Sequence, residues 1–430
     1  MKKLMCVILP FLVTGLLTSC QNVTPSDEFK PSMDTETRCE LRIVGDYSNF
    51  EALEAEFDKF NEFYPNVELS YGKVDDYANT IGTVLASGDD APNIFFSYAA
   101  WMGGDAKYAS VLPHMEDLSD TNLKLNLNCI RPGLLNHDAN NKVLMVPVFS
   151  RTYGTLVNND LFKKENIAIP TSWNELLAAC ESFVSKGYES PMMGYSVKDS
   201  DCLMNTIAYP AFVVALANSS DPQAIEKANN LDSSAGEYMR DALTKVQQLI
   251  GNGAIDLTEC DKISDNYTKV ILRFFEGDVP MMICKGDTVS GTKKRESQSE
   301  AYTQHPFEYS YIPIPMTEQG GYFIDSPSVQ FSVNKDCKNL DMTHEFMRFL
   351  IRKDELNAMA SLKRLVTPTN EMSFDPVYAA FGQIPAERTF SPEGLGVKDP
   401  LAKQIRIASF RVGKGQLTID EAIRQYGQLS

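Results

Sequence analysis

Apolar residues follow two alternating periods along the first part of the chain, and this alternation limits the possible fold more than any other feature. The short apolar runs at 41–45, 66–71 and 93–98 have the length of buried strands. Between them, apolar residues recur at steps of three and four over 50–63 and 78–85, as on the core-facing stripe of a helix. The order strand, helix, strand, helix, strand predicts an α/β fold in which helices cover a parallel sheet.

Polar and aromatic residues occur where two of these predicted strands end. Asp46 and Tyr47 follow the first strand, and Tyr98 and Trp101 come at the end of the third strand and just after it. Ligands of open parallel sheets bind beyond the carboxyl ends of the strands. We therefore expect these four side chains to lie at a ligand site.

The N-terminus has the features of an export signal. Lys2 and Lys3 precede an apolar run over 4–17, which has the length of a signal-peptide core and is too short to cross a bilayer as a helix. The run ends in Leu17-Thr18-Ser19-Cys20, which resembles the bacterial lipobox. This resemblance implies that residues 1–19 are a lipoprotein signal peptide and that Cys20 carries the lipid. An ordinary cleaved signal with a chance cysteine is the alternative.

The segment after Cys20 is expected to be a flexible tether. Residues 20–39 are polar, contain two prolines and show no apolar period. No later segment reaches the roughly 18 consecutive apolar residues that a transmembrane helix needs. We therefore expect the folded part to be held by its lipid at the extracytoplasmic face of the cell membrane.

Length, charge and cysteine spacing narrow the class of protein further. The roughly 390 residues after the tether are too many for one compact core, so we expect two domains. The formal net charge of −17 disfavours nucleic acid and anionic lipid surfaces as partners. The mature chain has no CxxC pair, and Cys180 and Cys284 lie within apolar periods, which favours buried free thiols. We expect a monomer with no metal and no cofactor.

A second α/β pattern occupies the middle of the chain. Ser172 and Glu175 form a predicted capping box for a helix that runs to about residue 186 and stops at Gly187. The apolar run 279–284 predicts a buried strand with Asp287 beyond its carboxyl end. Trp173 lies just inside the predicted cap and is assigned to helix packing. The last hundred residues are predicted to be mainly helical.

Four short motifs occur in the order and at the spacing of one protein family. They are Pro147 to Phe162 with Gly154, Asn158, Asp160 and Leu161; Pro170 to Leu176; Phe275, Gly277, Pro280 and Met281; and IPIPMTEQGG at 312–321. In these motifs the chain resembles the bacterial family 1 extracellular solute-binding proteins, the sugar-capturing subunits of ABC importers. The chain departs from the family pattern at Asn93, Val157 and Thr288, where relatives carry other residues.

The resemblance implies a two-lobed, periplasmic-binding-protein-like type II fold with a hinge and a ligand cleft between the lobes. The implied N-terminal lobe covers 40–148 and 314–350, and the C-terminal lobe covers 149–313 and 351–430. The stretch 146–162 would then cross the hinge, so that polar side chains within an apolar run face the cleft. The segment IPIPMT, at 312–317, is expected to be another crossing.

A sugar site needs flat rings for the apolar faces of the sugar and bidentate polar groups for its hydroxyls. The candidate rings are Tyr47, Tyr98, Trp101, Tyr153 and Tyr322, and the candidate polar groups are Asp46, Asn93, Arg151 and Asp287. Arg151 would suit a carboxylated sugar such as a uronate; otherwise it would pair with an acidic residue across the hinge.

The sequence thus predicts a substrate-binding lipoprotein that captures a mono- or oligosaccharide by lobe closure and delivers it to the transmembrane subunits of an ABC permease. A ligand-presenting lipoprotein for a sensor and a secreted carbohydrate-active hydrolase are the alternatives. The four histidines are scattered, and the sequence from His344 places Arg348 where the second zinc ligand of H-E-x-x-H belongs. We therefore do not expect an enzyme.

Overall fold

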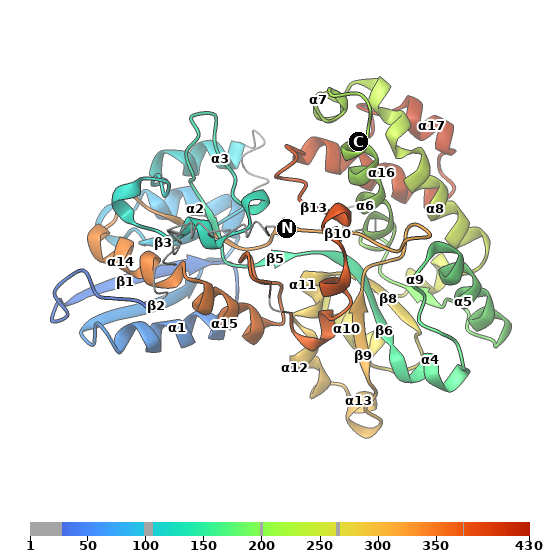
Figure 1. Ribbon diagram of the computed structural model, residues 1–430, viewed down its shortest axis with the longest axis horizontal. Coiled ribbons are helices and arrows are strands. Elements are labelled where there is room, and N and C mark those ends of the chain that lie inside the picture. The colour runs from blue at the N-terminus through green and yellow to red at the C-terminus, as the bar shows by residue number, and fades with distance from the viewer. Residues whose placement is uncertain (1–27, 99–105, 198–200, 264–266, 373) are drawn as a thin grey trace, which may run out of the picture.

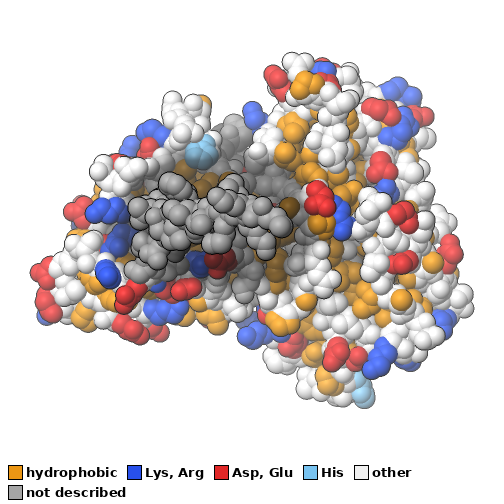
Figure 2. All heavy atoms as spheres, viewed as in Figure 1, with side chains coloured by type: hydrophobic (Ala, Val, Ile, Leu, Met, Phe, Trp, Pro, Cys, Tyr) orange, Lys and Arg blue, Asp and Glu red, His pale blue; other side chains and the backbone are white. Residues whose placement is uncertain are grey.

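The chain forms two lobes joined at a narrow waist (Figure 1). The computed structural model describes residues 28–98, 106–197, 201–263, 267–372 and 374–430. Each lobe has a sheet of its own and a separate hydrophobic core. Acidic and basic side chains are interspersed over both lobes in the view of Figure 2. Among the described residues, no helix combines the length and the apolar character needed to cross a membrane.

The first lobe contains the predicted strand–helix alternation, which the structure confirms. Its sheet has the order β2-β1-β3-β12-β4, in which β1 pairs in parallel with β2 and β3, and β12 is antiparallel to β3 and β4. Its elements are β1 (Cys39–Gly45), α1 (Glu51–Asn61), β2 (Val67–Lys73), α2 (Tyr77–Leu85), β3 (Ile94–Ser97), α3 (Ala106–Val111), β4 (Val146–Pro147), β12 (Gln330–Val333), α14 (Leu340–Leu350) and α15 (Lys353–Lys363). Gln330 at the start of β12 pairs with Ser97 at the end of β3, so the carboxyl end of β3 lies where the chain enters this sheet from the waist.

The second lobe is built on a sheet of order β7-β8-β6-β9. Its strands are β6 (Tyr153–Asn158), β7 (Met192–Met193), β8 (Met281–Lys285) and β9 (Tyr309–Ile312), with the separate ribbon β10 (Phe323–Ile324) and β13 (Thr389–Phe390). Its helices are α4 (Asn159–Glu165), α5 (Trp173–Ser185), α6 (Leu203–Ala217), α7 (Ala224–Asn229), α8 (Arg240–Gly251), α9 (Leu257–Cys260), α10 (Tyr267–Phe274), α11 (Gly286–Val289), α12 (Thr292–Glu296), α13 (Glu300–Gln304), α16 (Asp399–Gly413) and α17 (Ile419–Arg424). Gly154 of β6 must be glycine, because a Cβ there would collide with the backbone carbonyl of Ile312 on β9.

Two sequence predictions about this lobe concern single side chains. Trp173 is buried in the core of the second lobe, as expected. The capping box at α5 forms only in half: Ser172 Oγ accepts from the backbone N–H of Glu175, whereas the Glu175 carboxylate accepts from the backbone N–H and hydroxyl of Thr171. The glutamate therefore reaches one residue further back than a capping box requires.

The waist is formed by segments that run from one lobe to the other. Two of them are β5 (Ser150–Arg151) and β11 (Ser326–Pro327), which pair in an antiparallel manner. A further segment crosses at Val366, whose carbonyl accepts a 2.9 Å hydrogen bond from the backbone N–H of Ser150. The backbone bonds between these segments make the waist a small sheet of its own.

The two cores correct two of the predicted lobe boundaries. Ile314 and Met316 still belong to the second core, so the chain does not cross at the IPIPMT segment but at β11. The stretch 351–365 belongs to the first lobe rather than to the second, because α15 packs its buried face in the first core and Leu365 is the last member of that core. The sequence prediction failed because the apolar period continues unchanged through both stretches. Such a period shows that side chains are buried, but it does not show in which of the two cores they pack.

The expected tether is also shorter than predicted. Phe29 is only 4% exposed and packs in the first core. Ser32 donates from its backbone N–H and its hydroxyl to the Glu345 carboxylate at 2.8 and 2.6 Å, and Arg348 donates to the carbonyl of Lys30 at 2.6 Å. Residues 29–34, which we call the N-terminal strap, are therefore docked on α14 and do not form part of a flexible linker.

Candidate ligand-binding cleft

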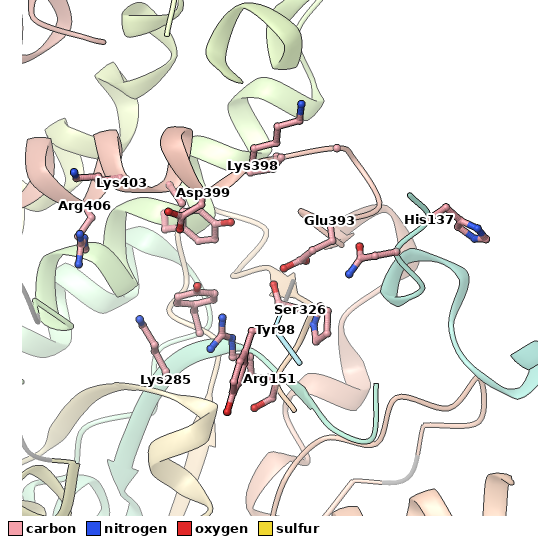
Figure 3. Close-up of a pocket in the computed structure, with 18 of the residues that line it drawn as sticks. Tyr98, His137, Arg151, Lys285, Ser326, Glu393, Lys398, Asp399, Lys403 and Arg406 are labelled. Carbon is pink, nitrogen blue, oxygen red and sulfur yellow. The ribbon is translucent and has the colours of Figure 1, made fainter. Parts of the chain in front are cut away.

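A pocket of about 1000 Å³ lies between the lobes and is lined by both lobes and by the waist (Figure 3). The first lobe contributes Tyr98, Leu112 and the loop 136–140; the waist contributes Arg151 and residues 326–328; the second lobe contributes Tyr153, Asn205, Tyr209, Lys285, Glu393, 396–399, Ala402, Lys403 and Arg406. Such a volume lies at the upper end of the range for pockets that enclose a small organic ligand. The pocket therefore has room for a ligand that touches both lobes.

The register of the second sheet builds the pocket wall of that lobe. Tyr153 on β6 pairs directly with Lys285 on β8, and the Lys285 ammonium lies 5.9 Å from the centre of the Tyr153 ring. Asn205 and Tyr209 are one helical turn apart on α6 and both line the pocket. The Tyr153 and Tyr209 rings lie 5.2 Å apart at 46°. The wall thus combines two rings with an ammonium and an amide.

Arg151 pairs with an acidic residue across the waist. Its Nη1 lies 3.3 Å from Asp287 Oδ2, and Asp287 Oδ1 accepts a 2.7 Å hydrogen bond from Ser328 Oγ on the neighbouring crossing segment. Of the two sequence interpretations of Arg151, the structure therefore shows the ion pair. The Nε atom of Arg151 is buried and has no hydrogen-bond partner in the part of the chain that the structure describes, so the guanidinium still offers a donor at the pocket.

Tyr98 and Asp46 are joined by a hydrogen bond at the edge of the first lobe. The Tyr98 hydroxyl donates to Asp46 Oδ2 at 2.7 Å, and burial together with this carboxylate raises the pKa of Tyr98 above its usual range. Tyr98 therefore stays protonated and lines the pocket. Tyr47 lies beside them with its ring edge-on to Phe96 at 5.3 Å and does not belong to the pocket lining.

Asn93 is a structural residue and not part of the pocket, contrary to the sequence prediction. It is 5% exposed, its Oδ1 accepts from the backbone N–H of Arg42, and its Nδ2 donates to the Lys338 carbonyl and to Thr343 Oγ1. All of its amide atoms are thus used to hold the start of α14 against β1. An asparagine at the end of a turn satisfies such backbone groups as readily as it binds a ligand.

The remaining predicted rings are those of Tyr322 and Trp101. Tyr322 packs against Phe390 of β13 with ring centres 6.1 Å apart, and it does not line the pocket. Trp101 lies outside the described residues. Of the nine predicted ligand residues, the structure brings Tyr98, Arg151 and Tyr153 to the pocket lining, and Asp46 and Asp287 hydrogen bond or pair with two of these three.

Several residues of the pocket were missed by the sequence reasoning. Lys285 ends a strand whose other four residues are apolar and fully buried, and this break in an apolar run could have identified it. Asn205 and Tyr209 are polar residues on a helix that is apolar nearly all round, which is a similar signal. Glu393 and Lys398 lie in a loop whose sequence gives no comparable signal. Within the described ranges, no group of three or more His, Cys, Asp and Glu side chains is arranged to hold a metal ion.

Glu393 is expected to make the stability of the protein depend on pH. Burial raises the pKa of its carboxyl to about 7, and its Oε2 is buried without a hydrogen-bond partner among the described residues. Because the pKa is higher in the folded than in the unfolded chain, the stabilising contribution of the neutral carboxyl is complete below about pH 4.5 and is lost as the pH rises through about 7. Glu393→Gln, which stays neutral, should therefore be more stable than the wild type at pH 8 but not at pH 4.5.

This expectation is checked by thermal unfolding of both proteins between pH 4.5 and 8. The stability difference in favour of Glu393→Gln should grow over this range by roughly 1 to 3 kcal/mol, from about 1.4 kcal/mol per pKa unit. Glu387→Gln is the control, because Glu387 is exposed and lies on the same segment. Parallel pH profiles of the wild type and Glu393→Gln would contradict the expectation.

Comparison with known proteins places this architecture in a family. The sequence profile for bacterial extracellular solute-binding protein matches residues 45–356. No curated protein matches the chain. Among solved structures, the apo form of RafE from Streptococcus pneumoniae is similar over 94% of this chain and 98% of its own, with 16% identity and a TM-score of 0.67.

Two further structures show the same fold. The GacH receptor of Streptomyces glaucescens, solved without ligand and in complex with acarbose, has 17% identity and a TM-score of 0.67, with 91% of this chain and 97% of that chain covered. A chitin oligosaccharide binding protein has the same identity and TM-score, with 91% and 98% covered. The predicted two-lobed type II fold is therefore confirmed. Because the profile covers most of the sequence, the chain belongs to the family of bacterial extracellular solute-binding proteins and acts outside the cytoplasm.

Proposed function

We propose that this protein is the substrate-binding subunit of an ABC importer and that it captures a mono- or oligosaccharide between its lobes. The observation that carries the proposal is the interlobe pocket, whose lining combines the rings of Tyr98, Tyr153 and Tyr209 with amide, guanidinium and hydroxyl groups. Rings match the apolar faces of a sugar, and bidentate polar groups match its hydroxyls. The similar structures support this, since RafE was solved with raffinose and a sugar transporter of Bacillus licheniformis with stachyose.

Unpaired polar atoms at the pocket support a hydroxyl-rich ligand. Within the described ranges, the Nε of Arg151, the Oδ1 of Asn205 and the Oε2 of Glu393 are buried without hydrogen-bond partners, and all three residues line the pocket. A buried polar atom without a partner costs about 1–3 kcal/mol, so such atoms are normally satisfied by water or by a ligand. A sugar hydroxyl can accept from the guanidinium and donate to an amide or carboxyl oxygen. Closure of the lobes would remove water from these contacts and strengthen them.

The proposed location is the membrane surface, through a lipid on Cys20. Since the N-terminal strap begins at Phe29, eight residues, 21–28, separate Cys20 from the docked strap. Even a fully extended chain of eight residues reaches at most about 28 Å. The strap would thus hold the α14 face of the first lobe close to the membrane and to the permease subunits.

Thermal-shift screening against a library of mono- and oligosaccharides tests the proposal. A sugar present at about 100 times its dissociation constant stabilises the folded state by about 2.7 kcal/mol, which is readily detected as a rise in Tm. Small-angle scattering with that sugar should show a more compact molecule. Incubation with the bound glycan should leave it intact, and released fragments would favour the hydrolase class instead. A library in which no sugar raises the Tm would overturn the proposal.

Tyr153→Leu should weaken binding of the sugar found in the screen by tenfold or more. Leucine keeps an apolar, although smaller, side chain at this position and lacks the flat ring that covers an apolar sugar face. Tyr153→Phe keeps the ring and should bind within about threefold of the wild type, since the affinity in this comparison depends on the ring. Calorimetric titration measures both variants.

Tyr302→Leu is the matched control for Tyr153→Leu. Tyr302 is a partly buried tyrosine of the same lobe, it packs against Phe275 with ring centres 4.6 Å apart, and it does not line the pocket. Its replacement should leave the affinity unchanged. Equal affinities of Tyr153→Leu and the wild type would mean that Tyr153 is not a sugar platform.

A further inference from the structure

We infer that the ligand is an acidic sugar and that its uronic acid carboxylate binds at the second-lobe end of the pocket, against Lys285, Lys403 and Arg406. These three residues are called the basic end below. The inference rests on the proposed function, because it assigns a chemical class to the ligand of the same pocket. Figure 3 shows the basic end gathered on one side of the pocket, with Glu393 and His137 further along it.

The charge of the pocket lining differs from the charge of the whole chain. The chain carries a formal charge of −17, and acidic and basic side chains are interspersed over the surface shown in Figure 2. Among the described residues that line the pocket, five are lysine or arginine and three are aspartate or glutamate. One of the three acids, Glu393, has a pKa of about 7 and is thus partly neutral at that pH. A negatively charged group is therefore better accommodated in the pocket than on the chain as a whole.

Arg151 does not supply this positive charge, because Asp287 compensates it. Lys285 is different: it is half-buried, and no acidic side chain of the described part of the chain lies within ion-pair distance of its ammonium. The neighbour of Lys285 on the sheet is Tyr153, whose ring attracts the ammonium. A ring does not take up the N–H donors of the ammonium as an oxygen acceptor would. An ammonium has three donors, so a carboxylate oxygen is the natural partner for it.

The amide oxygen of Asn205 provides a second, independent observation in favour of an acidic sugar. Asn205 is 6% exposed, it lines the same wall, and its Oδ1 has no hydrogen-bond partner among the described residues. An amide oxygen and an ammonium that line one wall without such partners suit a ligand that presents both a hydroxyl donor and an anionic acceptor. A uronic acid residue has this arrangement, because its carboxylate and its ring hydroxyls are held on one rigid ring.

Two acidic residues, Asp201 and Asp399, lie near the basic end, and only one of them lines the pocket. Asp201 faces both Lys285 and Arg406, but it is 2% exposed and its carboxylate accepts from the backbone N–H groups of Met204 and Asn205 at the start of α6. Asp201 therefore lies behind the wall and does not line the pocket. Asp399 does line the pocket; it lies in the first turn of α16, where it interacts favourably with the helix dipole, and a single carboxylate there faces three cations.

The test compares matched pairs of sugars by calorimetric titration of the full chain. Each pair has a neutral oligosaccharide and the same oligosaccharide with a terminal uronate, and a sulfated version serves as a third arm. We expect the uronate member to bind at least tenfold more tightly than the neutral one, with a difference that shrinks as the salt concentration rises. Lys285→Met should abolish this difference, because it removes the ammonium and keeps an unbranched side chain at this position.

Two variants serve as references. Lys285→Arg keeps the charge and should retain the uronate preference, whereas Lys163→Met removes an exposed lysine of α4 in the same lobe and should have no effect. Equal or weaker binding of the uronate would overturn the inference and leave the proposed function intact. Tighter binding of the sulfated sugar than of the uronate would overturn the carboxylate assignment. A preference for the uronate that persists in Lys285→Met would overturn the assignment to the basic end, and no binding of any sugar would overturn the proposed function itself.

Discussion

Arg131→Ala is expected to lower the free energy of unfolding by about 3–5 kcal/mol, the usual cost of removing one partner of a buried ion pair. The Arg131 guanidinium donates to both carboxylate oxygens of Asp325 at 2.6 and 2.9 Å. It also donates to the Thr369 carbonyl at 2.6 Å and to Ser150 Oγ at 3.0 Å. These three residues belong to three different segments of the waist, so one side chain holds all of these segments together.

Burial makes this ion pair costly to break. The side chains of Arg131 and Asp325 are 13% and 5% exposed, and the alanine variant would leave the Asp325 carboxylate buried without its cation. Urea unfolding followed by circular dichroism measures the loss. A double variant that replaces both residues with leucine should lose less than Arg131→Ala, because no uncompensated charge remains.

The control for Arg131 is an exposed arginine with a comparable number of partners. Arg240 contacts Glu237 and Asp420 on the surface of the second lobe, where solvent screens the charges. Arg240→Ala should therefore change the stability little. If Arg131→Ala lost no more stability than Arg240→Ala, the waist could not depend on the bidentate pair.

Phe29→Ala is expected to weaken the docking of the N-terminal strap by about 3 kcal/mol, the lower end of the cost of truncating a buried phenylalanine. The Phe29 ring meets Phe63 and Phe349 edge-on at 5.1 and 5.3 Å, and the Arg348 guanidinium lies 4.6 Å from its centre. The loss should appear as local opening rather than as unfolding of the lobe, because the rest of the first core is continuous without the strap.

Limited proteolysis and amide hydrogen exchange measure the strap directly. Cleavage within 28–38 should become much faster in Phe29→Ala, while exchange in the sheet of the first lobe stays slow. Leu362→Ala is the control, since Leu362 is an exposed apolar residue of the same lobe at 50% exposure. Unchanged cleavage of the strap in Phe29→Ala would show that the hydrogen bonds of Ser32 to Glu345 suffice to hold it.

The N-terminal strap and the lobe boundaries show which features of the fold local sequence patterns can predict and which they cannot. The strands and helices at 41–98 were predicted because their periods are local and because each of them buries its apolar face against its chain neighbours. Residues 28–38 are as polar as a tether, and a single phenylalanine among them gives no period. Its burial depends on a groove formed by α1 and α14, which are far apart in the sequence.

The candidate site also contains some residues that local sequence patterns could identify and others that they could not. Tyr98, Arg151 and Tyr153 could be found because they interrupt or end apolar runs, and such breaks mark positions that face a cleft. Asn93 was predicted by the same reasoning and yet is structural, since its amide donates to the Lys338 carbonyl just before α14, a contact that no local pattern reveals. Glu393 lies in a loop that gives no such pattern, and only the approach of that loop to the waist brings it to the pocket.

The sequence by itself thus determined the α/β class, the strand order along the chain, the family and the use of the waist as part of a cleft. Periodicity and short motifs encode these features because each depends on neighbours within a few residues or on one repeated spacing. Only the tertiary structure decided where the chain crosses, that Asp325 meets Arg131, and that Lys285 faces the pocket without an acidic partner in the described part of the chain. These contacts join segments separated by many residues, so their energies are set by the packing of two lobes and not by any local pattern.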